Sequence, residues 1–198
     1  MKRFALLFLL LCAPVGAARA QSTTMVGGHL GVEFFDTTTA LETAPVIGGR
    51  WAWFARNGHG LEVGLEYSET RLEAGQLTVL LELPFDDAQT VTEQLSRFSL
   101  DYGYVGRGGV VRPYVTAGVG YLRGDIVLSH RAERILDALN RTVDTRDSTP
   151  TYEAAVGVLV GEERLRFRYD LRLIWIDQLF GNDGTATFQT SGGLSWVF

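Results

Sequence analysis

The 198-residue chain carries 23 acidic and 18 basic residues, and this acidic balance argues against a nucleic acid as a partner. Its single cysteine, Cys12, falls in the N-terminal segment, so the rest of the chain has no disulfide framework. Beyond that segment no apolar run approaches about 18 residues, which argues against a transmembrane helix.

Residues 1–20 have the pattern of a secretory signal peptide. Lys2 and Arg3 precede an apolar stretch over 4–15, and Ala18-Arg19-Ala20 provides the small residues that a signal peptidase recognises. The apolar stretch is too short to cross about 30 Å of hydrocarbon as a helix, so a membrane anchor is the weaker interpretation. Cleavage after Ala20 would leave a domain of residues 21–198 with 15 basic and 23 acidic residues, a net charge of −8.

In this predicted mature domain, apolar residues recur at every second position, which is the period of a β-strand. In the segment 26–34, for example, Leu30 and Val32 share one face, while Gly31 and Glu33 lie on the other. Segments with this alternation follow one another along the chain at 26–34, 47–53, 61–68, 97–104, 114–121, 152–160, 165–175 and 188–198. We therefore expect eight strands.

The connections between these strands alternate strictly in length. The short ones occupy 57–60, 105–112 and 161–163, and the long ones occupy 36–45, 70–93, 122–150 and 177–184. This pattern predicts an all-β fold, an eight-stranded antiparallel up-and-down transmembrane β-barrel with long extracellular loops. In such a barrel the short turns face the periplasm, so both termini are expected there as well.

The two faces of the strands differ in a way that separates a membrane barrel from a soluble one. A soluble barrel points its apolar face inward and its charged face outward. Here the apolar face carries bulky aromatic residues such as Trp51, Tyr102 and Trp175, whereas the polar face combines charge with glycine, as suits a narrow interior. Because buried charges persist only when they are paired, the polar face predicts a lumenal ionic network in place of an open channel. The predicted members are Glu33, Arg50, Glu62, Glu66, Arg97, Asp101, Glu153, Arg166, Arg168, Asp170 and Arg172.

Two segments resemble those of the eight-stranded outer-membrane barrel family represented by the OmpA transmembrane domain and OmpX. They are residues 112–121 (Arg-Pro-Tyr-Val-Thr-Ala-Gly-Val-Gly-Tyr) and the last strand, which ends in Leu194-Ser195-Trp196-Val197-Phe198. The resemblance implies an integral position in a bacterial outer membrane, in contact with outer-membrane lipid and lipopolysaccharide. It also implies that Leu194, Trp196 and Phe198 form the C-terminal signal that the barrel-assembly machinery recognises.

Residues suited to catalysis are few. His29 is expected on the lumenal face and His59 in a turn, while His130 follows Ser129, so that on a strand these two side chains would point apart. The His-x-Ser arrangement of the lipid A deacylases does not occur. We therefore expect no enzyme activity and no catalytic, cofactor or metal site. A lipid A-modifying enzyme is the alternative interpretation, and a narrow pore is the third.

The long loops carry the remaining distinctive patterns. Residues 131–143 have apolar residues at helical spacing, and 77–83 are apolar enough to form a strand. As a ninth wall strand, 77–83 would move the C-terminus to the other side of the membrane, so we assign it to a loop hairpin. Ile135, Leu136 and Leu139 are then expected to pack against Val79, Leu81 and Leu83 as a cap. The predicted function is structural or one of adhesion and binding, with a ligand or protein partner outside the cell contacted through these loops.

Overall fold

The computed structural model describes residues 22–36, 41–72, 91–128, 134, 145–161, 164–177 and 184–198. The predicted signal peptide 1–20, the loop hairpin at 77–83 and, except for Arg134, the loop helix at 131–143 lie outside these residues and remain predictions. Within the described residues, no helix is long and apolar enough to cross a membrane.

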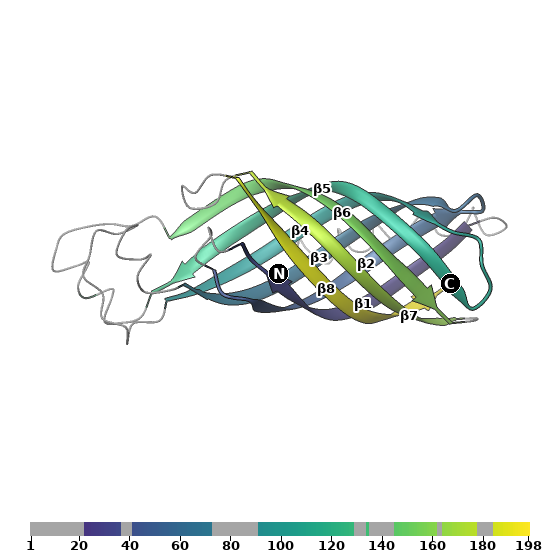
Figure 1. Cartoon of the computed structure of the whole chain (residues 1–198), viewed down its shortest axis with the longest axis horizontal. Helices are drawn as coiled ribbons and strands as arrows, with labels where there is room; N and C mark the ends of the chain where they lie inside the picture. The colour runs from purple at the N-terminus through teal and green to yellow at the C-terminus, as the bar shows by residue number, and fades with distance from the viewer. Residues whose placement is uncertain are drawn as a thin grey trace, which may run out of the picture.

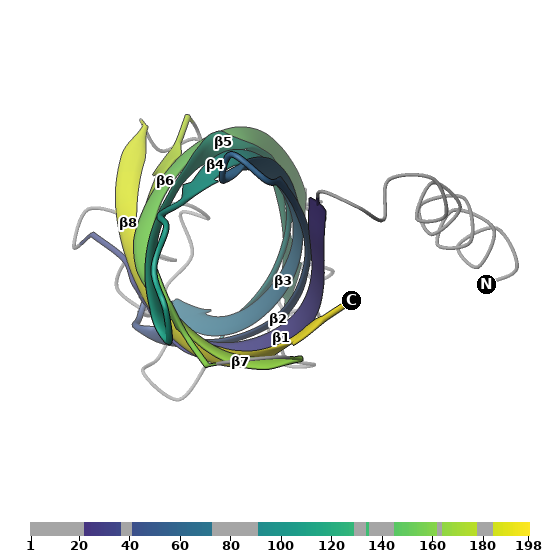
Figure 2. The same cartoon turned by 90° about the vertical axis from the view of Figure 1, so that its right-hand side faces the viewer.

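Eight antiparallel strands close into one barrel, as the sequence predicted. The strands are β1 (Ser22–Phe34), β2 (Ala44–Ala55), β3 (His59–Leu72), β4 (Val91–Val105), β5 (Val111–Val127), β6 (Arg146–Val160), β7 (Leu165–Ile176) and β8 (Thr185–Val197). Each strand pairs with the next in the chain, and β8 pairs with β1 to complete the ring (Figures 1 and 2). Closure leaves no wall strand with an unpaired edge, which is what a sheet needs in lipid.

The two ends of the barrel differ in their connections. The N-terminal end of β1, the C-terminal end of β8 and the short β2–β3, β4–β5 and β6–β7 connections lie at one end, which we call the turn end. The longer connections β1–β2, β3–β4, β5–β6 and β7–β8 leave from the other, the loop end. In the β2–β3 turn, Gly58 has a φ of 91°, a left-handed conformation that suits glycine.

The strands are longer at the loop end than the alternation predicted. The connection expected at 122–150 is shorter, because β5 continues to Val127 and β6 begins at Arg146. Backbone pairing persists through this region, and Asp125 lies opposite Arg146 with their side chains 3.1 Å apart. The sequence did not predict this extension, because 146–151 are polar apart from Pro150 and because Ile126 and Val127, which are adjacent, interrupt the alternation of apolar and polar residues at the end of β5. The connections predicted at 36–45 and 70–93 are shortened in the same way.

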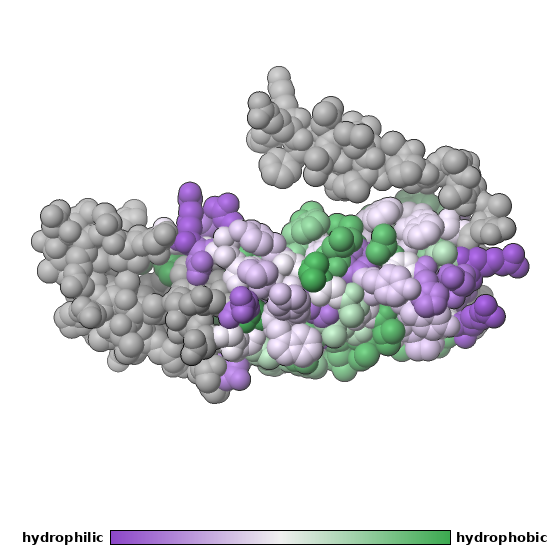
Figure 3. All heavy atoms as spheres, turned by 90° about the horizontal axis from the view of Figure 1, so that it is seen from above, coloured by the Kyte–Doolittle hydropathy of each residue, from purple (hydrophilic) through white to green (hydrophobic). Residues whose placement is uncertain are grey.

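The outer face is apolar and the inner face polar, as expected for a barrel in lipid. Leu30 is 66% exposed and Tyr102 is 58% exposed, while the inward Glu62 and Asp101 are each only 1% exposed. In the space-filling view, pale and green residues form a belt between purple, hydrophilic residues on either side (Figure 3). This distribution matches the apolar band of an outer-membrane barrel.

Two apolar clusters cross the interior, one near each end. The turn-end cluster joins Met25, Ala52, Phe54, Tyr114 and Leu159. The loop-end cluster joins Leu95, Leu122, Ile174 and Ile176, with Phe35 and Leu41 packed against it. Each cluster brings together strands that are not hydrogen-bonded neighbours, such as β2 with β5 or β5 with β7, so each spans the lumen. The polar interior is therefore enclosed between two apolar layers.

Candidate functional site

The polar interior between the two apolar clusters is the most organised group of functional side chains in the described chain. Every residue predicted for the lumenal ionic network is buried, with a relative exposure of 9% or less. All of them except Arg166 form ion pairs with one another across the lumen. Their guanidinium groups come from β2, β4 and β7, and their carboxylates from β1, β3, β4, β6 and β7.

On the side nearer the turn end, Asp170 is the central acceptor. Arg50 Nη1 donates to both carboxylate oxygens of Asp170 at 2.6 Å, a contact between residues 120 positions apart in the chain. Arg168 lies two residues before Asp170 on the same inward face and donates to Glu62 Oε1 at 3.0 Å. Tyr114 Oη donates to Asp170 Oδ1 at 2.5 Å and accepts from Arg168 Nε at 2.6 Å.

Tyr114 has a second contact with Arg168, because the guanidinium carbon lies 4.4 Å from the centre of the tyrosine ring. The ring fits only because Gly157 faces it from β6. A Cβ at position 157 would lie 2.6 Å from Tyr114 Oη and 2.3 Å from the carbonyl oxygen of Tyr169. Glycine on the inner face thus provides the space in which a large aromatic side chain can join the network.

On the side nearer the loop end, Arg97 and Arg172 are the central donors. Arg97 Nη1 donates to Glu33 Oε1 at 3.2 Å, and Arg97 Nη2 donates to Glu66 and, at 2.5 Å, to Gln189 Oε1. Arg172 Nη1 donates to Asp101 Oδ2 at 3.1 Å and also to Glu153. These bonds connect opposite walls of the barrel, so the two halves of the network cross-link the lumen.

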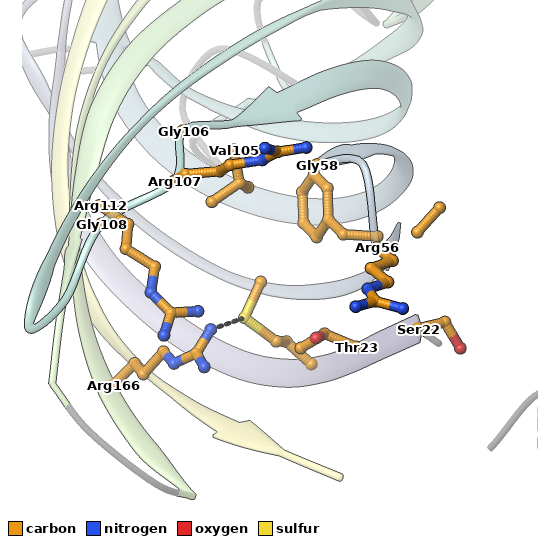
Figure 4. Close-up of a pocket in the computed structure, with 13 residues that line it drawn as sticks. Ser22, Thr23, Arg56, Gly58, Val105, Gly106, Arg107, Gly108, Arg112 and Arg166 are labelled. Atoms are coloured by element: carbon orange, nitrogen blue, oxygen red, sulfur yellow. Dashed lines mark hydrogen bonds between the residues drawn. The ribbon is translucent and has the colours of Figure 1, made fainter. Parts of the chain in front are cut away.

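Arg166 does not belong to this network, which corrects the sequence-based prediction. It lies at the turn end, where its Nη1 is 3.8 Å from Met25 Sδ, and it makes no ion pair with any described residue (Figure 4). It shares the inward face of β7 with Arg168 and Asp170, but it lies nearer the turn end, beside Met25 of the turn-end cluster. Strand alternation fixes the face of a residue and not its depth in the lumen, so the sequence could not make this distinction.

Several buried polar residues were missed by the sequence analysis. Tyr114 and Gln189 lie on the inward face of predicted strands, but they carry no charge and were not assigned to the network. Thr187 precedes the strand predicted at 188–198 and also joins the network. Glu93 was expected in a loop. It is instead a fully buried residue of β4, and neither of its carboxylate oxygens has a hydrogen-bond partner in the part of the chain that the structure describes.

The two described histidines lie at different places in the barrel. His29 Nε2 lies 2.9 Å from Glu66 Oε1 inside the lumen, and His59 Nδ1 lies 2.7 Å from Tyr102 Oη on the outer surface. His59 begins β3, whereas the sequence placed it in the turn. Ser129 and His130 lie outside the described residues. Among the described side chains, no group of three or more acidic, histidine or cysteine residues is arranged to hold a metal ion.

The C-terminal residues expected to form an assembly signal lie on the outer face. Leu194 is 55% exposed, Trp196 is 46% exposed and Phe198 is 71% exposed. The backbone nitrogen of Phe198 donates to the carbonyl oxygen of Thr24 at 2.9 Å, so the last residue still contacts β1.

A closed antiparallel barrel with an apolar exterior and a charged, cross-linked interior defines an integral membrane β-barrel. The chain belongs to the outer membrane protein beta-barrel domain family, whose model matches residues 4–198. It is thus an outer-membrane barrel, as the sequence resemblance implied, and its exterior contacts membrane lipid.

Solved barrels share this fold at low sequence identity. Neisserial surface protein A is 12% identical with a TM-score of 0.55, and the alignment covers 89% of this chain and 97% of that one. The N-terminal barrel of Pseudomonas aeruginosa OprF is 17% identical with a TM-score of 0.52, covering 88% and 97%. Ail, the attachment invasion locus protein of Yersinia pestis, is 10% identical with a TM-score of 0.50 in its complex with the heparin analogue sucrose octasulfate, covering 90% and 98%. No curated protein matches the chain in sequence.

Proposed function

We propose that this barrel acts as a surface-interaction protein, for adhesion or binding, through the connections at its loop end. The observation that carries the proposal is the closed lumen. Among the described residues, a layer of ion pairs lies between two apolar clusters, so side chains fill the middle of the lumen. We therefore assign contacts with molecules outside the cell to the long connections at the loop end.

The charge of these connections favours a partner with a basic surface. Residues 73–90 contain four acidic residues and no basic one, and 177–184 contain two acidic residues and no basic one. Residues 128–145 balance three arginines against three acids. Charge complementarity at a protein interface increases the rate of association and disfavours partners of like charge.

The fold relatives support an interaction role. Ail is named as an attachment protein, and one of its structures holds a heparin analogue. The connections of the present chain are acidic overall, so a sulfated glycan is not the partner that its charge favours. The likeness supports the class of function and not the ligand.

For the orientation, we propose that the turn end faces the periplasm and the loop end faces the outside of the cell, which places both termini in the periplasm. This is the usual arrangement of short turns and long loops in outer-membrane barrels. The exposed, apolar Leu194, Trp196 and Phe198 would then be available to the barrel-assembly machinery before insertion. Deletion of Phe198 should slow insertion and lower the amount of folded protein in the outer membrane, measured by heat-modifiable gel migration. Unchanged levels would count against this role.

The binding function can be tested with the folded barrel in zwitterionic nanodiscs, applied to an array of extracellular-matrix proteins and sulfated glycans. Binding above that of empty nanodiscs is expected on basic protein spots. Replacement of 73–90 or 129–144 by a short Gly-Ser linker should remove this binding, whereas replacement of 107–109 at the turn end should not. Binding that survives both loop replacements would contradict the proposal.

The two alternative functions have direct tests. A narrow pore predicts steady conductance in planar bilayers, whereas the closed lumen predicts small or intermittent conductance. A stable, porin-like conductance would overturn the sealed interior. A lipid A-modifying enzyme would change the mass of lipid A incubated with the folded barrel, and we expect that mass to stay the same.

A further inference from the structure

At the turn end, four arginines surround a cavity of about 480 Å³. The arginines are Arg56, Arg107, Arg112 and Arg166, and none of the described residues that line the cavity is acidic. Figure 4 shows the guanidinium groups of Arg112 and Arg166 beside each other, with Arg56 across the cavity from them. This concentration of positive charge contrasts with the net acidic character of the whole chain.

Arg166 is the most informative member of the group. It is only 7% exposed, and among the described residues its Nε has no hydrogen-bond partner and its Nη1 contacts only the weak acceptor Met25 Sδ, at 3.8 Å. Arg112 lies close enough to repel it electrostatically. A buried guanidinium without a counter-ion is costly, and a second positive charge beside it increases that cost. An anion bound between Arg112 and Arg166 would neutralise these positive charges and remove the cost of burying Arg166 without a counter-ion.

The lining and the volume of the cavity indicate which class of anion would fit it. Its apolar side is formed by Met25 and Phe54 of the turn-end cluster and by Val105, which packs against that cluster, and the four arginines add charge to the lining. Its volume falls within the range of roughly 300–1,000 Å³ that is usual for sites of small ligands, so it is larger than a single ion requires. The planar fork of an arginine side chain matches phosphate oxygens in a bidentate manner.

We propose that this arginine-lined cavity, hereafter the basic cavity, binds a phosphate-bearing group about the size of a lipid headgroup or a pyrophosphate. Arg112 and Arg166 hold the phosphate oxygens, Arg56 contributes from the opposite wall, and the apolar floor accommodates the carbon-bearing part of the ligand. The source of the phosphate is either a phospholipid of the adjacent leaflet or a soluble phosphate compound. The site lies at the opposite end of the barrel from the connections assigned to surface interaction.

The experiment uses the folded barrel in the phosphate-free detergent dodecyl maltoside. Isothermal titration calorimetry measures binding of inorganic pyrophosphate and of monomeric dihexanoyl phosphatidylglycerol. Arg112→Gln and Arg166→Gln each remove one charged donor and should weaken binding by about tenfold. Arg71→Gln, at an exposed arginine of the loop end, is the matched control and should bind like the unmodified protein.

Each outcome of the calorimetry supports or overturns the assignment of a phosphate site to the basic cavity. Binding of the lipid alone identifies a headgroup site, and binding of pyrophosphate alone or of both identifies a site open to soluble phosphate. Absence of binding by both probes, or equal affinity in the arginine variants, would overturn the proposal. Binding of tetraglutamate without either phosphate probe would overturn it in favour of an acidic peptide. Because Arg112 is only partly buried, its variant keeps the test decisive even if Arg166→Gln fails to fold.

Discussion

The turn end and the loop end of the barrel are closed in the same way but differ in charge. Each has an apolar cluster that crosses the lumen, built around Phe54 and Leu159 at the turn end and around Leu122 and Ile174 at the loop end. Outside these clusters, the turn end presents the basic cavity, whereas the loop end continues into connections that are acidic overall.

The difference shows that closing the lumen and presenting a surface are separate tasks. Apolar packing is non-directional, so similar sets of aliphatic and aromatic residues can close either end. The charged residues outside each cluster, in contrast, differ between the two ends. In the proposed orientation, the basic end faces the periplasm and the acidic end faces the outside of the cell.

The two ends are held apart by the lumenal ionic network in the middle of the barrel. We expect the largest loss of stability from a substitution in this network. Arg168→Ala removes the guanidinium that contacts both Glu62 and Asp170 and leaves buried carboxylates without that partner. We expect a loss of roughly 3–5 kcal/mol in the free energy of unfolding, measured by urea titration of the barrel in lipid vesicles. Arg123→Ala, in an exposed ion pair at the loop end, is the control and should change stability far less. Equal effects would mean that water reaches the lumenal pairs.

A change in the loop-end cluster should have the next largest effect. Ile174 is fully buried in the lumen, whereas its neighbour Leu173 points to the lipid and is 36% exposed. Ile174→Ala should therefore lower the free energy of unfolding by roughly 2–5 kcal/mol, because it leaves a cavity in a packed interior. Leu173→Ala should cost less in the same urea titration. The reverse order would show that the loop end is not closed by packing.

The packing around Tyr114, on the side of the lumen nearer the turn end, can be tested by adding a methyl group to a neighbouring glycine. Gly157→Ala would push a methyl group against Tyr114 and should destabilise the barrel by about 1–3 kcal/mol. Gly28 is the matched control, since an added Cβ there would meet nothing closer than the Gly48 carbonyl oxygen at 3.7 Å. Thermal unfolding followed by tryptophan fluorescence should separate the two variants. A harmless Gly157→Ala would argue against the close packing around Tyr114.

The smallest effect is expected at the exposed rim of the loop end. Asp125→Asn removes the acceptor shared by Arg123 and Arg146, which are 2.9 Å and 3.1 Å away. Because water and salt screen exposed charges, the urea midpoint should shift less than in Arg168→Ala, Ile174→Ala or Gly157→Ala. The small shift should disappear in high salt. A large shift that persists in high salt would assign a structural role to this rim.

Much of the fold was readable from local patterns. The period of two assigned Glu62, Asp101 and Asp170 to one face and Leu30 and Tyr102 to the other, and the structure agrees. The number of strands and the order in which they pair followed from eight alternating segments, joined by connections that are alternately short and long. Strand ends were predicted less accurately, because the polar residues that extend β6 have no hydrophobic pattern and the apolar residues at the end of β5 do not alternate.

The sequence by itself determined the barrel and the inward face of each strand, because the direction of a side chain on a strand depends only on its position in an alternating backbone. Which inward residues meet was decided by the tertiary structure. Arg50 reaches Asp170 across the lumen, while Arg166, on the same face of the same strand as Asp170, is left in the basic cavity. Depth and cross-lumen distance depend on the tilt and stagger of all eight strands when the ring closes, and no local pattern in a single strand contains them.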